Sequence, residues 1–254
     1  MAAKQGPARW HAVISQLQVV EDSEAAERLL HALAAPVAPT VLGFVNAHAM
    51  NLIVGDDAYG EALLGADVLL RDGSGMAMLY RQLGLAPGLN MNGTDFIPRL
   101  VHAYAGRRVA FWGTRQPYLG QAVQCCVATY GVTPVSVHDG FADVSTYLHL
   151  ATEHRPDLIL LGMGMPKQEA VAAALKGTGL VCTIVCGGAV LDFMGGKVHR
   201  APAWVRRLGA EWLYRLLCEP RRLFMRYVVG NPLFLLRARR FARRHRAAKD
   251  GLLQ

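Results

Sequence analysis

The chain has 254 residues, 52% of them hydrophobic, and a formal net charge of +8. This is enough apolar material for one large or two small cores. No apolar run reaches the roughly 18 residues of a membrane-spanning helix, the N-terminus lacks a signal-peptide pattern, and the cysteines have no zinc-binding spacing. We therefore expect a cytoplasmic protein with reduced cysteines.

The positive charge is concentrated at the C-terminal end of the chain. Residues 197–254 contain 15 of the 27 lysines and arginines but only 3 of the 19 acidic residues, so they carry +12, whereas residues 1–196 carry −4. A basic segment on a mildly acidic body indicates an anionic partner: a nucleic acid, an anionic membrane or a phosphorylated substrate.

The predicted elements alternate between strand and helix. Residues 12–20 are expected to form a strand, followed by a helix from Asp22 or Ser23 to about Leu33. Residues 47–64 have a helical pattern. Continuously apolar strands are expected at 39–45, 66–70, 107–113, 133–138, 156–164 and 180–188. This alternation predicts an α/β fold, with a mostly parallel sheet covered by helices on both faces.

From residue 201 onward the pattern is entirely helical, interrupted by prolines. We therefore divide the chain into an α/β core, residues 1–200, and a helical basic C-terminal appendage, residues 201–254. Trp204, Leu208 and Trp212 recur at helical spacing in the appendage, which predicts an apolar face that docks it on the core.

Residues that follow the predicted strands are candidates for a site, because ligands of open parallel sheets bind beyond the carboxyl ends of the strands. In ADVLLRDGSG, residues 66–75, Asp72 follows a buried strand beside Gly73 and Gly75. It can act as a general base toward a substrate hydroxyl, with the glycines letting the backbone come close to the substrate. It can equally be a turn residue or a helix N-cap. This stretch alone leaves both interpretations open.

Two further loops follow predicted strands. GMGMPKQE, residues 162–169, matches neither GxGxxG nor Walker A. Pro166 can begin a helix with free amides, while Lys167 and Gln168 add a charge and a neutral donor. The loop is either ligand-facing or a capped helix with solvated side chains. GGAVLDFMGGKVHRAP, residues 187–202, is a tight structural connection or a nucleotide-facing loop.

The appendage contains two kinds of basic segment. In residues 211–227, three arginines can face one way, and converging guanidiniums suit a diphosphate; they are Arg215, Arg222 and Arg226. In residues 231–249 an apolar stripe runs beside many arginines; its members are Phe234, Ala238 and Phe241. The second segment is typical of a membrane-surface helix or of a solvated charge run.

Six motifs follow one another along the chain, and the resemblance to a known family rests on their order and spacing. They are VNA at 45–47, ADVLLRDGSG at 66–75, NGTDF at 92–96, GMGMPKQE at 162–169, GGAVLDFMGGKVHRAP at 187–202 and EWLYRLLCEPRRLFMRY at 211–227. With them, from about residue 12 to residue 230, the chain resembles the WecG/TagA/CpsF family of bacterial glycosyltransferases. The resemblance implies a Rossmann-like α/β core with a membrane-targeting helical appendage. It also implies inverting, metal-independent transfer of a hexose from a UDP-sugar to an undecaprenyl-diphosphate-linked sugar.

The resemblance also assigns roles to matching positions. It implies that Asp72 is the catalytic base and that Asn46 and Gln168 bind substrate. It implies that three appendage arginines bind the diphosphate, namely Arg215, Arg222 and Arg226. No metal and no cofactor are expected.

Two positions depart from the family pattern. Phe44 stands where Thr is usual, and Asn90 stands where a basic residue is usual. Both are expected to lie where the donor or acceptor sugar binds, so the sugars stay open. Transfer from UDP-glucose to a glucosyl lipid, in exopolysaccharide synthesis, is the expectation from exopolysaccharide members of the family.

The expected partners are the UDP-sugar donor, the polyprenyl-diphosphate-linked acceptor and an anionic membrane surface. With these partners the protein is expected to lie peripherally on the cytoplasmic face of the plasma membrane. A homo-oligomer is left open.

The alternative function is that of a nucleotide-binding α/β module whose basic tail binds nucleic acid. The tail's aromatics and leucines lie in helical stripes and no RNA-binding motif occurs, so we expect no nucleic acid. A soluble glycosyltransferase with a small acceptor is the third interpretation.

Overall fold

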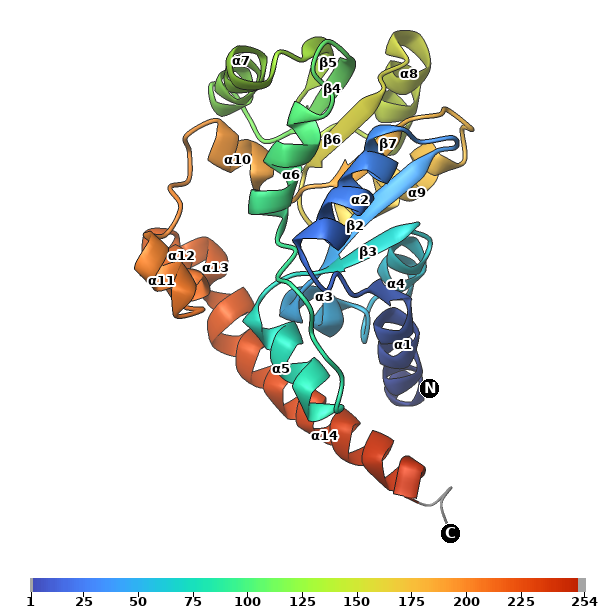
Figure 1. Ribbon diagram of the computed structural model, residues 1–254, viewed down its shortest axis with the longest axis vertical. Coiled ribbons are helices and arrows are strands. Elements are labelled where there is room, and N and C mark those ends of the chain that lie inside the picture. Colours follow the sequence, from blue (N-terminus) through green and yellow to red (C-terminus); the bar gives the residue numbers. More distant parts are fainter. Residues whose placement is uncertain (1, 251–254) are drawn as a thin grey trace.

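The computed structural model describes residues 2–250, and its centre is a seven-stranded sheet with the order β1-β3-β2-β7-β6-β4-β5 (Figure 1). Every pair of neighbouring strands is parallel. The strands are β1 (Leu17–Gln18), β2 (Thr40–Val45), β3 (Val68–Arg71), β4 (Arg108–Gly113), β5 (Thr133–His138), β6 (Leu158–Gly162) and β7 (Thr183–Cys186). The predicted Rossmann-like α/β architecture is confirmed.

Helices connect these strands and continue beyond them. Between the strands lie α2 (Ser23–Ala34), α3 (Ala47–Leu52), α4 (Asp57–Leu64), α5 (Ser74–Gln82), α6 (Gly93–His102), α7 (Tyr118–Tyr130), α8 (Val144–His154) and α9 (Lys167–Lys176). The chain begins with α1 (Ala2–Gln16). After β7 come α10 (Val190–Met194), α11 (Ala203–Arg207), α12 (Glu211–Cys218), α13 (Pro220–Phe224), a π-helix η1 (Met225–Val229) and α14 (Gly230–Asp250).

Hydrophobic cores lie on both faces of the sheet, because the strands are apolar on both sides. In β2, Val41 and Val45 point into one core, which is closed by α1, α3, α4, α5, α8, α9 and α14. Leu42 and Phe44 point into the other, which is closed by α2, α6, α7 and α10. The sheet is therefore packed on both faces, and the candidate site lies where its strands end.

The expected strand at 12–20 is wrong over most of its length. Helix α1 continues to Gln16, and only Leu17 and Gln18 pair with the sheet. Trp10, Val13 and Leu17 are buried at helical spacing, so tertiary packing outweighs the strand preference of the β-branched residues. Residues 47–64 form two helices rather than one, with Asp56 capping the second.

Two predictions about the appendage are also wrong. Trp204 and Leu208 do not dock on the core, because their side chains are 66% and 74% exposed. The stripe of residues 234, 238 and 241 faces the protein rather than a membrane. Phe234 is 1% exposed, and its ring lies 5.6 Å from that of Trp10 in α1.

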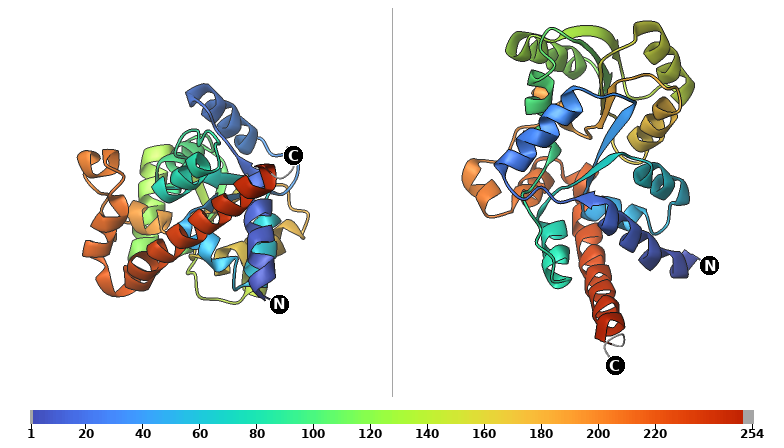
Figure 2. Two further views of the ribbon diagram at one scale, coloured as in Figure 1. Left: turned by 90° about the horizontal axis from the view of Figure 1, so that it is seen from below. Right: turned by 45° about the vertical axis from the view of Figure 1, so that its right-hand side comes forward.

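Helix α14 is thus part of the core packing as well as of the appendage. It contacts α3 and α5, and it crosses the molecule along the side that carries α1 (Figure 2). Phe241 also lies 5.6 Å from Trp10. The apolar side of α14 therefore faces α1, α3 and α5, and its arginines at 239, 240, 243, 244 and 246 are exposed.

Candidate active site

Asn46 and Asp72 lie side by side because β2 and β3 are parallel neighbours that end at the same edge of the sheet. The Asp72 amide donates to the carbonyl of Val45 at 2.8 Å, which extends the pairing by one residue. Asn46 Nδ2 donates to Asp72 Oδ2 at 3.3 Å. Asn46 Oδ1 accepts from the amides of His48 and Ala49 and so caps α3. The structure therefore brings these two predicted site residues into direct contact.

Asp72 does not cap the following helix. Gly73 is the N-cap residue of α5, and it makes no side-chain capping bond. Gly73 has a φ of +87°, which favours glycine. Gly75 serves a different purpose from the expected approach to a sugar: a Cβ there would lie 3.2 Å from Phe234 Cε1 in α14. The N-cap interpretation of Asp72 is therefore wrong.

The half-buried Asp72 carboxyl lies in a mixed electrostatic environment. Burial raises its pKa above the ordinary aspartate value, while the Asn46 hydrogen bond and the charges of Arg226, Arg215 and Arg71 act in the opposite direction. Burial has the larger effect. A buried carboxylate whose charge is only partly stabilised by its neighbours accepts a proton more readily than a solvated one, and this suits a general base.

The three predicted arginines come together around Arg226, and Arg226 and Arg215 lie near Asp72. Burial lowers the pKa of Arg226, and the neighbouring charges of Arg215 and Arg222 lower it further. The Arg215 guanidinium lies 5.2 Å from the centre of the Phe193 ring. Buried Nε atoms of Arg215 and Arg226 have no hydrogen-bond partner among the described residues. A concentration of positive charge with unused donors is suited to an anion.

Arg222 is partly neutralised by protein carboxylates. It is paired with Glu219 on the same helical segment and lies 3.9 Å from Asp192 Oδ2. Asp192, which is 7% exposed, also accepts from Thr114 Oγ1 and from Lys197 Nζ. These contacts link the appendage to the loop that follows β7.

Gln168 is placed differently from the expectation of a ligand-facing side chain. It is 1% exposed, its Oε1 accepts from the Gly188 amide at 2.9 Å, and its Nε2 donates to Glu169 Oε1 at 2.9 Å. Lys167 donates to the carbonyl of Ala142. Gln168 therefore fixes the loop after β7, and substrate binding by Gln168 stays a prediction.

The sequence did not single out Arg71 as a site residue. Its side chain, 5% exposed, donates to the carbonyls of Pro87, Gly73 and Gly88 at 2.7, 3.0 and 3.1 Å. It therefore holds the loop that carries Asp72. A charged residue at the end of an otherwise apolar strand is the signal that could have identified it.

His48, another residue that follows a predicted strand, lies near Arg226. Burial and the charge of Arg226 lower its pKa to about 4. The imidazole is therefore neutral near pH 7 and adds no further positive charge beside the arginines. Its position two residues after a strand-end asparagine is the only sequence signal.

Comparison with known proteins is decisive for the family. The profile described as "Glycosyl transferase WecG/TagA/CpsF family" matches residues 12–248. The chain belongs to this family of glycosyltransferases. Three relatives carry the name N-acetylglucosaminyldiphosphoundecaprenol N-acetyl-beta-D-mannosaminyltransferase. Those from Bacillus spizizenii, Bacillus subtilis and Staphylococcus aureus are 26%, 25% and 24% identical over 65%, 71% and 80% of this chain.

The matches span 65%, 72% and 81% of those relatives' own lengths. The first of them is therefore covered over slightly less than two thirds of its length.

The two departures from the family pattern have different surroundings. Phe44 is 5% exposed in the core, where it packs beside Gly93 and Ile97 rather than lining an open site. Asn90 Oδ1 accepts from the Gly73 amide at 2.7 Å. Asn90 therefore holds the backbone next to Asp72, and of the two departures it is the one that contacts the candidate site.

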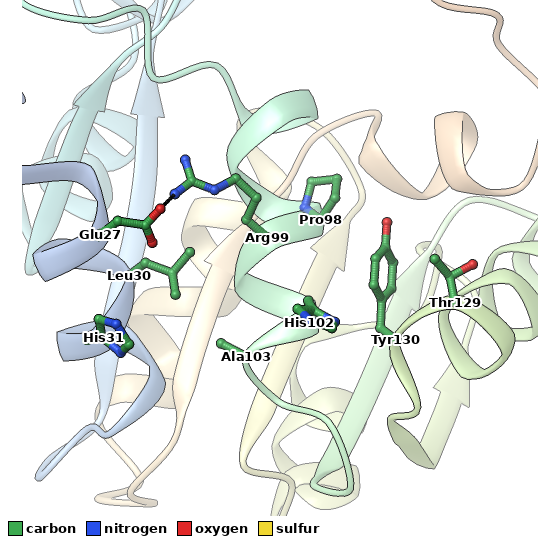
Figure 3. Close-up of a pocket in the computed structure, with 9 residues that line it drawn as sticks. All are labelled: Glu27, Leu30, His31, Pro98, Arg99, His102, Ala103, Thr129 and Tyr130. Carbon is green, nitrogen blue, oxygen red and sulfur yellow. Dashed lines mark hydrogen bonds and ion pairs between the residues drawn. The ribbon is translucent and has the colours of Figure 1, made fainter. Parts of the chain in front are cut away.

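Two hollows have linings that do not include Asp72. One of about 760 Å³ is formed by α2, α6 and the end of α7; its lining includes Glu27 and Arg99, which form an ion pair, and Tyr130 (Figure 3). A second, of about 390 Å³, is lined in part by Val190, Phe193 and Arg200. The second hollow borders the glycine-rich loop for which the sequence leaves a nucleotide-facing role open.

Residues 2–250 contain no group of three or more His, Cys, Asp or Glu side chains placed to hold a metal ion. In the same range, no helix is both long and apolar enough to cross a bilayer.

Proposed function

We propose that this glycosyltransferase transfers a sugar, with inversion, from a UDP-sugar to a sugar carried on a polyprenyl diphosphate in surface polysaccharide assembly. The observation that carries the proposal is the meeting of Asp72 with an arginine cluster, Arg215, Arg222 and Arg226, at the edge of the sheet. The acceptor named for the relatives, an undecaprenyl diphosphate carrying N-acetylglucosamine, has the matching chemistry.

In the proposed reaction Asp72 takes the proton from the acceptor hydroxyl as that oxygen attacks the anomeric carbon. The bond from the anomeric carbon to UDP breaks, and UDP leaves from the opposite face of the sugar with an added negative charge. Asn46 fixes the Asp72 carboxylate through its hydrogen bond. A positioned general base contributes about 10²–10⁴-fold to the rate. Arginines can offset diphosphate charge without a metal ion.

The proposed acceptor is a lipid, and the appendage offers it a surface. Exposed apolar side chains cover much of α11–α13, η1 and the start of α14; they include Trp204, Leu208, Leu217, Phe224, Met225 and Leu236. Met225 directly precedes Arg226, so this apolar surface borders the arginine cluster. We propose that it lies against an anionic membrane, with exposed Arg221 and the outer arginines of α14 near lipid headgroups.

The test is a matrix of donors and acceptors read by UDP release in the presence of EDTA. UDP-glucose, UDP-N-acetylglucosamine and UDP-N-acetylmannosamine are each combined with glucosyl- and N-acetylglucosaminyl-diphosphate lipids. The proposal expects one donor to be consumed only when a diphosphate lipid is present, at a rate that EDTA does not change. Loss of activity in EDTA with recovery by Mg²⁺ or Mn²⁺ would contradict the proposal that arginines offset the diphosphate charge without a metal ion.

The nucleic-acid alternative is tested with the same preparation. Vesicles that contain anionic lipid should sediment the protein, and a short RNA should not compete. Release of the protein by RNA at constant ionic strength would favour the alternative function.

A further inference from the structure

Helix α3 touches the candidate base at one end and the appendage at the other. It begins after Asn46, which donates to Asp72, and it ends at Leu52. In its last turn Asn51 Nδ2 donates to the carbonyl of Gly230 at 2.7 Å. Arg237 Nη1 donates to Asn51 Oδ1 at 2.9 Å and to the Asn51 carbonyl at 3.3 Å. These bonds join α3 to the first and second turns of α14.

The residue that Asn51 holds lies at the end of the π-helix that carries Arg226. Gly230 directly follows η1, and its amide donates back to the carbonyl of Met225. A π-turn contains one more residue than an α-turn, so it rotates the preceding segment by about 100° relative to the helix that follows. The direction of Arg226 therefore depends on how η1 joins α14, which is the junction that Asn51 fixes.

Arg226 has no hydrogen-bond partner of its own at Nε within the described residues. Its neighbours Arg215 and Arg222 repel it, and burial also disfavours its charge. The ring of Tyr227 lies 5.5 Å from the guanidinium carbon of Arg226, where a cation–π contact favours the charge. Because no hydrogen bond to a described residue fixes its Nε, the guanidinium of Arg226 depends on the course of its own backbone, and so on the junction at Gly230, more than a fully hydrogen-bonded arginine would.

We propose that Asn51 is a positioning residue that holds Arg226 opposite Asp72 by fixing the junction between η1 and α14. This inference rests on the proposed function for its effect on catalysis, but its structural content does not depend on which substrate the enzyme uses. Asn51 itself contacts protein groups only, so it acts through Arg226.

The first test reads the position of Arg226 without any substrate. Phenylglyoxal labelling of Arg226 is measured by peptide mass spectrometry in the full-length protein, with exposed Arg28 as the internal reference. Asn51→Ala should speed the labelling of Arg226 relative to Arg28 by about tenfold, the size of effect expected when one buried coupling is lost. Unchanged labelling of Arg226 would overturn the proposal.

Gln16 supplies a matched control. Like Asn51 it is a half-buried amide side chain that holds backbone carbonyls, donating to Leu64 and Ala66 at 3.0 and 2.7 Å, and neither of these two bonds reaches the appendage. Gln16→Ala should lower stability comparably and leave Arg226 labelling unchanged. If Gln16→Ala speeds the labelling as much as Asn51→Ala, the effect is general loosening and the proposal is wrong.

Asn51→Asp separates the two bonds of Asn51. It keeps an acceptor for Arg237 but replaces the donor to Gly230 with an oxygen. If the Gly230 bond sets the junction, the Asp variant should resemble Asn51→Ala in the labelling of Arg226. An Asp variant that labels like the wild type would contradict the assigned role of that bond.

The second test is a double-mutant cycle with Arg226→Ala, read as kcat/KM for the diphosphate-lipid acceptor. Asn51→Ala should lower kcat/KM by about tenfold in the wild type and by less than about twofold when Arg226 is already absent. Equal losses in both backgrounds would show that Asn51 does not act through Arg226. If the wild type turns over no substrate, the proposed function fails, while the labelling result still decides the role of Asn51.

Discussion

At the scale of single residues, the Asp72 carboxyl is the centre of the proposed chemistry, and its pKa is set by opposing influences. Burial raises the pKa, and the charges of Arg226 and Arg215 reduce the rise. A general base must be ionised, so activity is lost as the pH falls through this pKa. We therefore expect the acid limb of kcat/KM to lie above the ordinary aspartate value.

Arg226→Ala removes a positive charge that lowers the pKa of Asp72. The acid limb of the pH profile of kcat/KM should therefore move to higher pH in this variant. Arg28→Ala, at an exposed arginine paired with Glu24 on α2, is the control and should leave the limb in place. A limb that moves to lower pH in Arg226→Ala would contradict the assigned electrostatics.

Glu169 predicts a pH dependence of stability. Burial raises its pKa to about 7, and its Oε2 has no hydrogen-bond partner among the described residues. Between about pH 4 and pH 7 the Glu169 carboxyl is protonated in the folded protein but ionised in the unfolded chain. The stability that this proton contributes is therefore present at low pH and is lost as the pH rises through that window. In Glu169→Gln this loss disappears.

The free energy of unfolding of Glu169→Gln should therefore exceed that of the wild type at pH 8 by about 1–3 kcal/mol, and by much less at pH 5. Urea unfolding at the two pH values measures both differences. An equal difference at pH 5 and pH 8 would show that the Glu169 proton is not responsible.

At the scale of elements, the contact between α5 and α14 explains a glycine that the sequence interpretation assigned to the substrate. A side chain at Gly75 would meet Phe234, whose ring fills that space. Gly75→Val should lower the free energy of unfolding by about 1–3 kcal/mol through overpacking. Phe234→Leu in the same chain should restore part of this loss, which urea unfolding can measure. Strictly additive losses would contradict the contact.

The exposed apolar surface of the appendage is expected to contribute to membrane binding. Replacing Trp204 and Leu217, which are 66% and 74% exposed, by serine should weaken sedimentation with anionic vesicles without lowering stability. Phe141→Ser with Val181→Ser removes exposed apolar groups elsewhere on the molecule and is the matched control. If both pairs weaken binding equally, the membrane contact is not located on the appendage.

At the scale of the whole molecule, hydrophobic pattern predicted every strand of the sheet except the short β1. Segments such as 39–45 and 156–164 are apolar on both sides, so they predict buried parallel strands and also the edge on which Asp72 and Asn46 meet. Pattern could not distinguish a stripe that packs on protein from one that faces lipid, because both have the same helical period. The stripe around Phe234 packs against Trp10, whereas that around Trp204 is exposed.

Only part of the candidate site was predictable, because local sequence features do not contain the tertiary contacts. Asp72 and the three arginines stand out by position and charge and Asn46 by the family resemblance, and the structure brings Asn46, Arg215 and Arg226 close to Asp72. Asn51 and His48 interact with segments far away in sequence, through the bond from Asn51 to Gly230 and the charge of Arg226 near His48, while Arg71 binds the carbonyls of Pro87 and Gly88 in the loop after α5. Such contacts depend on tertiary packing, which a local motif does not contain. The buried position of Gln168 was missed because a polar residue after a strand resembles a solvent-facing one.

The most direct test of the central claim is single-turnover sugar transfer to a diphosphate-lipid acceptor by wild type and by Asp72→Asn. The substitution keeps the size of the side chain and removes its ability to take a proton. We predict that transfer slows by about 10²–10⁴-fold, while UDP binding and the thermal unfolding midpoint stay close to those of the wild type. Transfer by Asp72→Asn at a rate near that of the wild type would contradict the account, because the base would then lie elsewhere.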